Sequence, residues 1–322
     1  MSAQAPINTV SLSDYLIYLR DTKHRSPQTL DLYSRSMKAC GLDVIRQDEI
    51  PALWAKLRQQ YDSGAVSRVF VEKTKTLIRG AMRRKAWHFE PTEDYQYLLD
   101  KFNAEEADVL EYTDDEIRII LAVTYPDTDL FNACVLQSLS GVRIGAIEGL
   151  RWEDFHVVPD APDVMIYKVL SKGKFYTPAI STRVFNFLKA RNDKLNNPYL
   201  VWFDDGFQST FARRMYLKLR YQLIQKYDLV DALDLGNKSL QHSMRHYFAT
   251  QATSVLYEED AAILTGHKVY SGTLSKYVNK RIKKIGALPL PEYQRKIAEL
   301  YKRTPLFSYP IESIAKDAEI WR

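Results

Sequence analysis

The sequence predicts a mainly α-helical protein with one small β-sheet, divided into two domains. At 322 residues the chain is long for a single domain and suits two. Apolar residues recur at spacings of three and four along most of its length, which is typical of amphipathic helices. One stretch, residues 163–180, instead has two strand-like runs around a glycine turn, which favours a β-hairpin.

The composition is that of an ordinary globular protein. Hydrophobic residues make up 46% of the chain and charged residues 26%, so the chain has enough apolar residues to form hydrophobic cores. No run approaches the roughly 18 apolar residues of a membrane span, and residues 1–10 lack the pattern of a signal peptide. Cys40 and Cys134 fall in different predicted helices, so we expect two free thiols and a cytoplasmic location.

The positive charge is concentrated near the N-terminus. The whole chain carries a net charge of +5, but residues 1–90 hold 15 Lys and Arg against 9 Asp and Glu. Residues 91–322 hold 30 and 31, so they are nearly neutral. An excess of this kind is expected where a domain lies against a polyanion, although it is also common on soluble domains.

Residues 1–90 are predicted to form a domain of four helices. The first covers residues 14–20, and the second begins at Ser26-Pro27, a hydroxyl cap followed by proline at the first helical position, and ends at Gly41. Pro51 begins the third helix, and the fourth covers residues 67–87.

The fourth helix carries a basic stripe. Its members are separated by 7, 4 and 4 positions and therefore share one helix face: Arg68, Lys75, Arg79 and Arg83. A stripe of this kind is either a solvated helix face or a surface that contacts the phosphate backbone of a nucleic acid. We predict the second role for these residues as a working hypothesis.

Residues 91–111 are predicted to be a structured linker, because Pro91 lies in an acidic patch with only a short helical pattern after it. The second domain then covers residues 112–322. Thr113 followed by acids at positions 114–116 predicts a capped helix start, so these acids are explained by capping and the helix dipole, not by a metal. Further helices are expected over residues 127–138, 182–194, 207–226, 256–265 and 291–301, and one more begins at residue 240.

Six residues of the second domain form a candidate constellation. In chain order they are Arg143, Lys172, His242, Arg245, His267 and Tyr277. His242 and Arg245 are three positions apart in a helical pattern, so both project from one helix face. A guanidinium beside an imidazole binds a phosphate or a carboxylate, and a nearby tyrosine could attack the bound group.

The fragments around these residues resemble the catalytic domain of the tyrosine recombinases of the phage-integrase type. The resemblance rests on Ser-Gly-Val-Arg-Ile at 140–144, on the lysine hairpin that ends in Pro178, on His-x-x-Arg-His at 242–246, on Leu-Thr-Gly-His at 264–267 and on Tyr277. It covers about residues 112–280. Residues 1–90 resemble the helical core-binding domain that usually precedes the catalytic domain.

The resemblance implies transesterification at a DNA phosphodiester without metal, ATP or any other cofactor. Arg143 and Arg245 would hold the non-bridging oxygens, and His242 and His267 would add hydrogen bonds. Tyr277 would attack the phosphorus and form a 3′-phosphotyrosyl link. Lys172 would protonate the leaving 5′-oxygen, for which an ammonium suits better than a guanidinium.

Three departures from the family pattern stand out. The acid usually found three residues after the first arginine is replaced by Ala146, so Glu148 or another group would have to brace the site. Ten positions separate the last histidine from Tyr277, where nine are usual. The lysine hairpin is short, so Lys174 is an alternative to the lysine at position 172.

The partners implied are double-stranded DNA with a specific recombination site and a homo-tetramer that joins two such sites. Accessory DNA-bending proteins are candidates for further partners, no membrane partner is expected, and the location would be at the nucleoid. For the tail, residues 281–322, we hypothesise docking on a neighbouring subunit; the alternative is that it folds back on its own domain. Rival functions are a DNA-binding regulator without catalysis, a type IB topoisomerase or telomere resolvase, and a metal-dependent nuclease.

Overall fold

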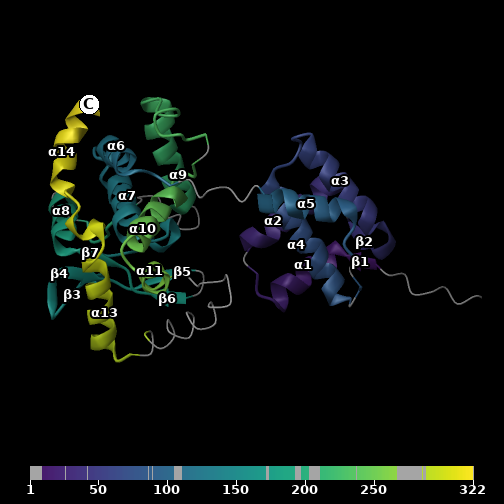
Figure 1. Ribbon diagram of the computed structural model, residues 1–322, viewed down its shortest axis with the longest axis horizontal. Coiled ribbons are helices and arrows are strands. Elements are labelled where there is room, and N and C mark those ends of the chain that lie inside the picture. Colours follow the sequence, from purple (N-terminus) through teal and green to yellow (C-terminus); the bar gives the residue numbers. More distant parts are fainter. Residues whose placement is uncertain are drawn as a thin grey trace, which may run out of the picture. The chain divides into compact units, whose positions relative to one another are not determined.

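The computed structural model divides the chain into two compact units, Met1–Ala107 and Asp108–Arg322, hereafter unit 1 and unit 2 (Figure 1). Each unit has its own apolar core. The structure describes residues 9–25, 27–41, 43–85, 87–88, 90–104, 111–171, 174–192, 197–202, 211–236, 238–266, 285 and 288–321.

Unit 1 is a helical domain with one short β-ribbon. Its elements are β1 (Thr9–Ser11), α1 (Leu12–Asp21), α2 (Pro27–Cys40), β2 (Val44–Arg46), α3 (Ile50–Asp62), α4 (Arg68–Arg84) and α5 (Glu93–Ala104). Pro27 and Gly41 begin and end α2 as predicted, and Gly41 has the positive φ of 67° that lets glycine stop a helix. The antiparallel pair β1–β2 was not predicted, because strands of three residues leave no periodic pattern.

Helix α5 lies in the range predicted as a linker, and its apolar side belongs to the core of unit 1. Leu98 and Phe102 are buried there. The ring of Tyr95 packs edge-on against the buried Trp54 of α3, with 5.1 Å between the ring centroids. The acidic composition of this stretch reflects its solvent side, and the apolar spacing of the other side determines where the helix packs.

Unit 2 is mainly helical, with two small antiparallel sheets. Its elements are α6 (Asp114–Thr124), α7 (Thr128–Ser140), β3 (His156–Val158), β4 (Ala161–Ile166), β5 (Val169–Ser171), β6 (Lys174–Tyr176), β7 (Ala179–Ser181), α8 (Thr182–Asn192), α9 (Phe211–Arg220), α10 (His242–Thr253), α11 (Glu258–Thr265), α13 (Leu290–Lys302) and α14 (Ile314–Asp317). The predicted fold class, mainly α with a small sheet, is therefore confirmed.

Two helix ends near the candidate site follow from local chemistry. Thr113 accepts a hydrogen bond from the backbone N–H of Glu116, and the Glu116 side chain accepts one from the N–H of Thr113, which makes the predicted capping box of α6. Helix α7 ends at Gly141, which has a φ of 64°. The chain then turns back toward the site, because glycine adopts this left-handed conformation without strain.

The predicted hairpin forms in a single register, but it is interrupted. Strand β4 pairs with β7, so that Ile166 lies opposite Ala179, and β5 pairs with β6, so that Val169 lies opposite Tyr176. Pro178 lies in the gap between β6 and β7. Proline has no N–H to donate, which breaks the ladder into two short sheets at this point.

The apolar residues of unit 2 gather in one core. Helix α7 runs through it with all residues from Leu130 to Ser140 buried. Cys134 is a free thiol in this core, and burial raises its pKa to about 12. In the described part of the chain, no helix has both the length and the apolar character needed to cross a bilayer.

The described part of the tail packs on its own unit, as the fold-back alternative predicts, and docking on a neighbouring subunit stays a prediction. In Figure 1 the segment from α13 to α14, in yellow, runs along one side of unit 2. The buried Tyr301 of α13 donates a hydrogen bond to the Leu139 carbonyl at 2.9 Å. Beyond it, Asp317 of α14 pairs with Arg118 of α6 at 3.0 Å. The apolar face of α13 is buried within the same chain.

Candidate active site

Unit 2 has a pocket of about 470 Å³ where the end of α7, the start of α10, strand β5 and helix α9 meet. Its lining includes Arg143, Ala146, Ser171, Tyr216, His242 and Arg245. None of the described residues that line it is acidic. A pocket that carries two guanidiniums without a carboxylate is suited to binding an anion.

Arg245 is the most firmly held of these residues. Its side chain is 1% exposed and donates hydrogen bonds to the carbonyls of Gly141 and Thr265. It also donates to the Tyr176 hydroxyl at 3.3 Å. Because these acceptors carry no net charge, they orient the guanidinium without neutralising it. Burial lowers the pKa of Arg245, but an arginine remains protonated in proteins.

Arg143 lies next to Arg245 in the pocket. It precedes the short 3₁₀ turn Ile144–Ala146 and is half-buried. One guanidinium nitrogen donates to the Ser171 hydroxyl at 3.2 Å. Besides burial, the positive charge of Arg143 is a further cause that lowers the pKa of Arg245. Two like charges held together are stabilised when an anion binds between them.

His242, at the first position of α10, presents an exposed imidazole to the same pocket. Its ring lies edge-on against the ring of His246 one turn later, with 4.4 Å between the centroids and 79° between the planes. Burial lowers the pKa of His246, and the nearby charge of Arg245 lowers it further. His246 is therefore favoured in its neutral form beside the imidazole of His242.

We expect acid to destabilise unit 2 partly through His246. Because its pKa is lower in the folded chain than the value of about 6.5 in an unfolded one, the unfolded state binds the proton more readily. This contribution to stability is present above pH 6.5 and is lost as the pH falls from there toward the folded pKa. Unfolding free energies measured by urea titration at pH 7.5 and pH 5.5 should differ less in His246→Gln than in the unmodified chain. An equal difference would contradict this assignment.

The pocket thus brings together three of the six predicted site residues: Arg143, His242 and Arg245. The other three, Lys172, His267 and Tyr277, lie outside the described residues, as does the side chain of the alternative Lys174.

Glu148 does not take the place of the acid that Ala146 replaces. Ala146 lies in the pocket lining and is 8% exposed, whereas Glu148 is not among the lining residues. The pKa of Glu148 is raised by burial alone, with no lowering by a neighbouring arginine. Its carboxylate is therefore not the brace of Arg143.

Sequence reasoning missed three residues of the site: Ser171, Tyr176 and Tyr216. Ser171 and Tyr176 belong to the hairpin, where their types indicate nothing beyond strand propensity. Tyr216 lies on the exposed side of α9 and lines the pocket. The one available signal was the position of Ser171 directly before the candidate lysine. Contacts of this kind depend on how distant segments pack.

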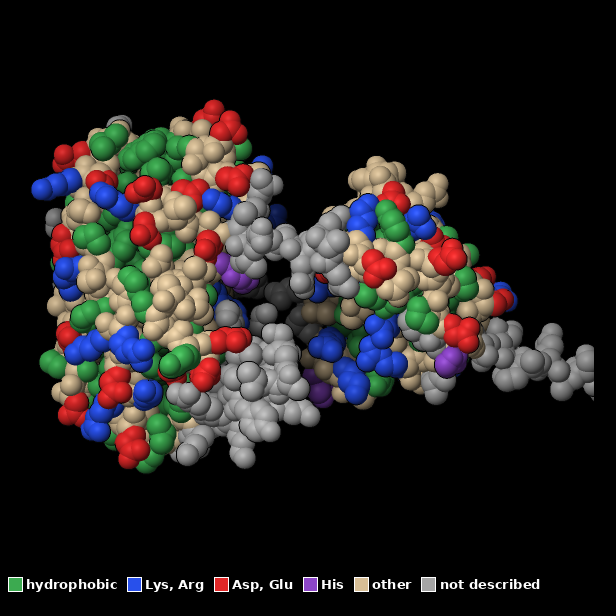
Figure 2. Space-filling model, viewed as in Figure 1, with side chains coloured by type: hydrophobic (Ala, Val, Ile, Leu, Met, Phe, Trp, Pro, Cys, Tyr) green, Lys and Arg blue, Asp and Glu red, His purple; other side chains and the backbone are tan. Residues whose placement is uncertain are grey.

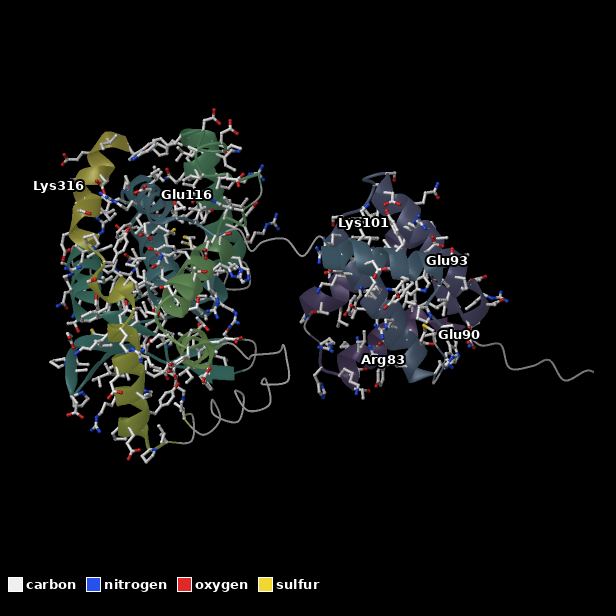
Figure 3. The ribbon with its side chains drawn as sticks, viewed as in Figure 1. Arg83, Glu90, Glu93, Lys101, Glu116 and Lys316 are labelled. Atoms are coloured by element: carbon white, nitrogen blue, oxygen red, sulfur yellow. The ribbon has the colours of Figure 1, made fainter. Side chains whose placement is uncertain are left out.

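The predicted DNA-binding stripe on α4 is partly covered by α5. Arg68 and Lys75 lie over the ring of Phe102, at 5.2 and 5.6 Å from its centroid. Arg79 donates to the Tyr95 hydroxyl at 3.0 Å. Arg83 is exposed at the end of α4 and is labelled in Figure 3. Figure 2 shows a group of Lys and Arg side chains on the lower part of the visible face of unit 1, with acidic side chains elsewhere on that face, and both signs interspersed on the visible face of unit 2.

Comparison with known proteins gives matches in structure but not in sequence. No protein-family model matches the chain, and no curated protein matches it. The structure is similar to the integrase of transposon Tn1549 in complex with circular intermediate DNA, with a TM-score of 0.58 and 14% identity over 84% of this chain and 99% of that one.

It is also similar to a lambda integrase dimer bound to a COC′ core site, with a TM-score of 0.55 and 17% identity over 84% of this chain and 77% of that one. A lambda integrase tetramer bound to a Holliday junction has a TM-score of 0.53 and 17% identity, over 84% of this chain and 78% of that one. The chain has the fold of the tyrosine recombinases.

Proposed function

We propose that the chain is a site-specific DNA recombinase that cleaves and rejoins DNA strands through a 3′-phosphotyrosyl intermediate. The observation that carries this proposal is the arginine pair of the pocket: Arg143 and Arg245 lie together with His242, and no acid is among the described residues around them. The fold of the tyrosine recombinases supports the same reaction class.

The pocket stabilises negative charge on a phosphate. When a nucleophile attacks phosphorus, extra charge develops on the non-bridging oxygens, and both guanidiniums donate hydrogen bonds to these oxygens. Arg245 is held by backbone carbonyls before the substrate arrives, so little reorganisation is needed. Because it is buried, its field is screened less than that of an exposed cation.

In the proposed reaction the Tyr277 oxygen forms a bond to phosphorus, and the bond from phosphorus to the 5′-oxygen breaks. His242 accepts the proton of the phenol, and Lys172 gives a proton to the 5′-oxygen. Attack by the 5′-hydroxyl of another strand reverses these steps. The ester bond is conserved throughout, so rejoining needs no ATP. Four copies of the chain on two DNA sites would exchange the strands.

The same pocket could also bind a DNA phosphate without reaction, as in a regulator. The alanine at position 146 favours this second candidate, because the acid that usually braces the first arginine for reaction is replaced there, whereas binding an anion does not need that acid.

A covalent assay tests the proposal. The full chain is incubated, in the presence of a chelator, with nicked DNA that carries its recombination site, which has first been mapped by sequencing the DNA that the chain retains. The expected product is a protein–DNA adduct whose modified peptide contains Tyr277. An adduct at the pocket residue Tyr216 would keep the reaction class and overturn the assignment of the nucleophile. DNA binding without adduct would favour the regulator, and cleavage that occurs only with added metal would favour a nuclease.

A further inference from the structure

We propose that Ser171 is a positioning residue, whose hydroxyl holds the guanidinium of Arg143 in the orientation that binds the scissile phosphate. The inference deepens the proposed recombinase function and rests on it. Ser171 lines the pocket, and its oxygen accepts a hydrogen bond from Arg143 at 3.2 Å. Within the described part of the chain, this is the hydrogen bond that orients the Arg143 side chain.

Arg143 needs such a contact because its surroundings do not fix it. It lies beside the positive charge of Arg245, which repels it, and the position three residues on is an alanine. An arginine side chain has several rotatable bonds, and an unheld one would turn away from a like charge. Arg245, in contrast, is anchored through Gly141 and Thr265.

A hydroxyl has a different effect on the pocket from a carboxylate. Ser171 is neutral, so it orients Arg143 and leaves the positive charge of both arginines available to the anion. A carboxylate would hold the guanidinium more strongly, through a charge-assisted pair, but would cancel one of the two charges. The pocket therefore combines a neutral hydrogen bond to Arg143 with the positive charge of two arginines.

The hydroxyl is itself well placed. Ser171 ends strand β5 and lies opposite Lys174 of β6, while Val169 at the other end of β5 is buried in the core of unit 2. Leu170, between them, also lines the pocket. A side chain on a paired strand is positioned more accurately than one on a free loop. Ser171 also directly precedes Lys172, so an effect through that lysine has to be separated from an effect through Arg143.

The test compares Ser171→Ala with the unmodified chain in two DNA substrates. One has the natural 5′-oxygen at the scissile bond, and the other has sulfur there, which departs without protonation. We expect Ser171→Ala to form the covalent adduct about 10- to 100-fold more slowly on both substrates, the range for a lost hydrogen bond to a charged group. Ser171→Thr, which keeps the hydroxyl, should react within about threefold of the unmodified chain.

Two further variants sharpen the result. Ala146→Glu, introduced into Ser171→Ala, places a carboxylate in the same pocket and should recover up to about tenfold of the lost rate, because it holds Arg143 but cancels one of the two charges. Ser313→Ala removes an exposed hydroxyl that donates to the Pro310 carbonyl in the tail, and it should react normally. Melting curves of all variants show whether each is folded.

A second readout does not depend on cleavage. Inorganic phosphate should raise the melting temperature of the unmodified chain, and about tenfold more phosphate should be needed for the same shift in Ser171→Ala. Equal adduct rates or equal phosphate dependence in these two chains would overturn the role of Ser171. A defect confined to the oxygen substrate would also overturn it, since the hydroxyl would then act through Lys172. Absence of adduct in the unmodified chain would instead contradict the recombinase proposal, and the phosphate titration would still decide the role of Ser171.

Discussion

Replacing Arg245 by lysine is expected to slow strand cleavage by about 100- to 1000-fold, the range for losing one preorganised donor to a developing oxyanion. The reason is the number of acceptors that the side chain serves. Arg245 donates to Gly141, Thr265 and Tyr176 while it faces the pocket. A lysine ammonium is a single point with three donors on a flexible stem, so it cannot satisfy these acceptors and hold two phosphate oxygens as well.

The measurement is the rate of adduct formation at saturating DNA, together with the affinity for the same DNA. Affinity should change little, because the affinity of a DNA-binding protein comes from many phosphate contacts, of which Arg245 would supply one. A matched control is Arg295→Lys, since Arg295 is exposed and pairs with Asp160 away from the pocket. Equal cleavage rates in Arg245→Lys and the unmodified chain would show that Arg245 is only a structural residue.

Replacing Gly141 by alanine is expected to lower the unfolding free energy of unit 2 by about 2 to 5 kcal/mol. Two causes add. The residue has a φ of 64°, which costs a residue with a Cβ about 1 to 2 kcal/mol. The new Cβ would also lie 2.3 Å from the ring of Phe248 of α10, so the ring would have to move within a packed core.

Gly149→Ala separates the two causes. Gly149 has a φ of 74°, but a Cβ there would meet no atom within 4 Å. It should therefore show the backbone cost alone, about 1 to 2 kcal/mol. Urea unfolding of both variants, followed by a probe in unit 2, gives the comparison. Equal losses in the two variants would mean that the contact with Phe248 is relieved without cost. Cleavage should also fall in Gly141→Ala, because the Gly141 carbonyl helps to orient Arg245.

Local chemistry made much of the fold predictable. The capping box at Thr113, the proline that begins α2 and the glycines that end α2 and α7 are set by interactions within a few residues. The hairpin followed from its strand-forming residues and its turn, and Pro178 explains the break in it. These features are encoded by neighbours in sequence, so they can be read without knowledge of the packing.

Long-range packing decided other features that the sequence left open or indicated wrongly. The acidic stretch that holds α5 was predicted as a linker, yet its apolar side packs in the core of unit 1. For the tail the sequence left docking on a neighbouring subunit and folding back as alternatives, and in the structure Tyr301 and Asp317 bind within unit 2. On α4, Arg68 and Lys75 contact Phe102 of α5, which a helical stripe alone does not reveal. A periodic pattern shows that a face is buried or charged, but not what covers it.

By itself, the sequence determined the mainly helical fold class and the residue types of the site, and the resemblance drawn from its motifs indicated the tyrosine recombinase fold. Only the tertiary structure showed that Arg143, His242 and Arg245 share one pocket, that Glu148 is outside it, and that Ser171 contacts the first arginine. The physical reason is separation along the chain. Arg143 and Ser171 are 28 positions apart, and their contact exists only because α7, β5 and α10 pack around a common core.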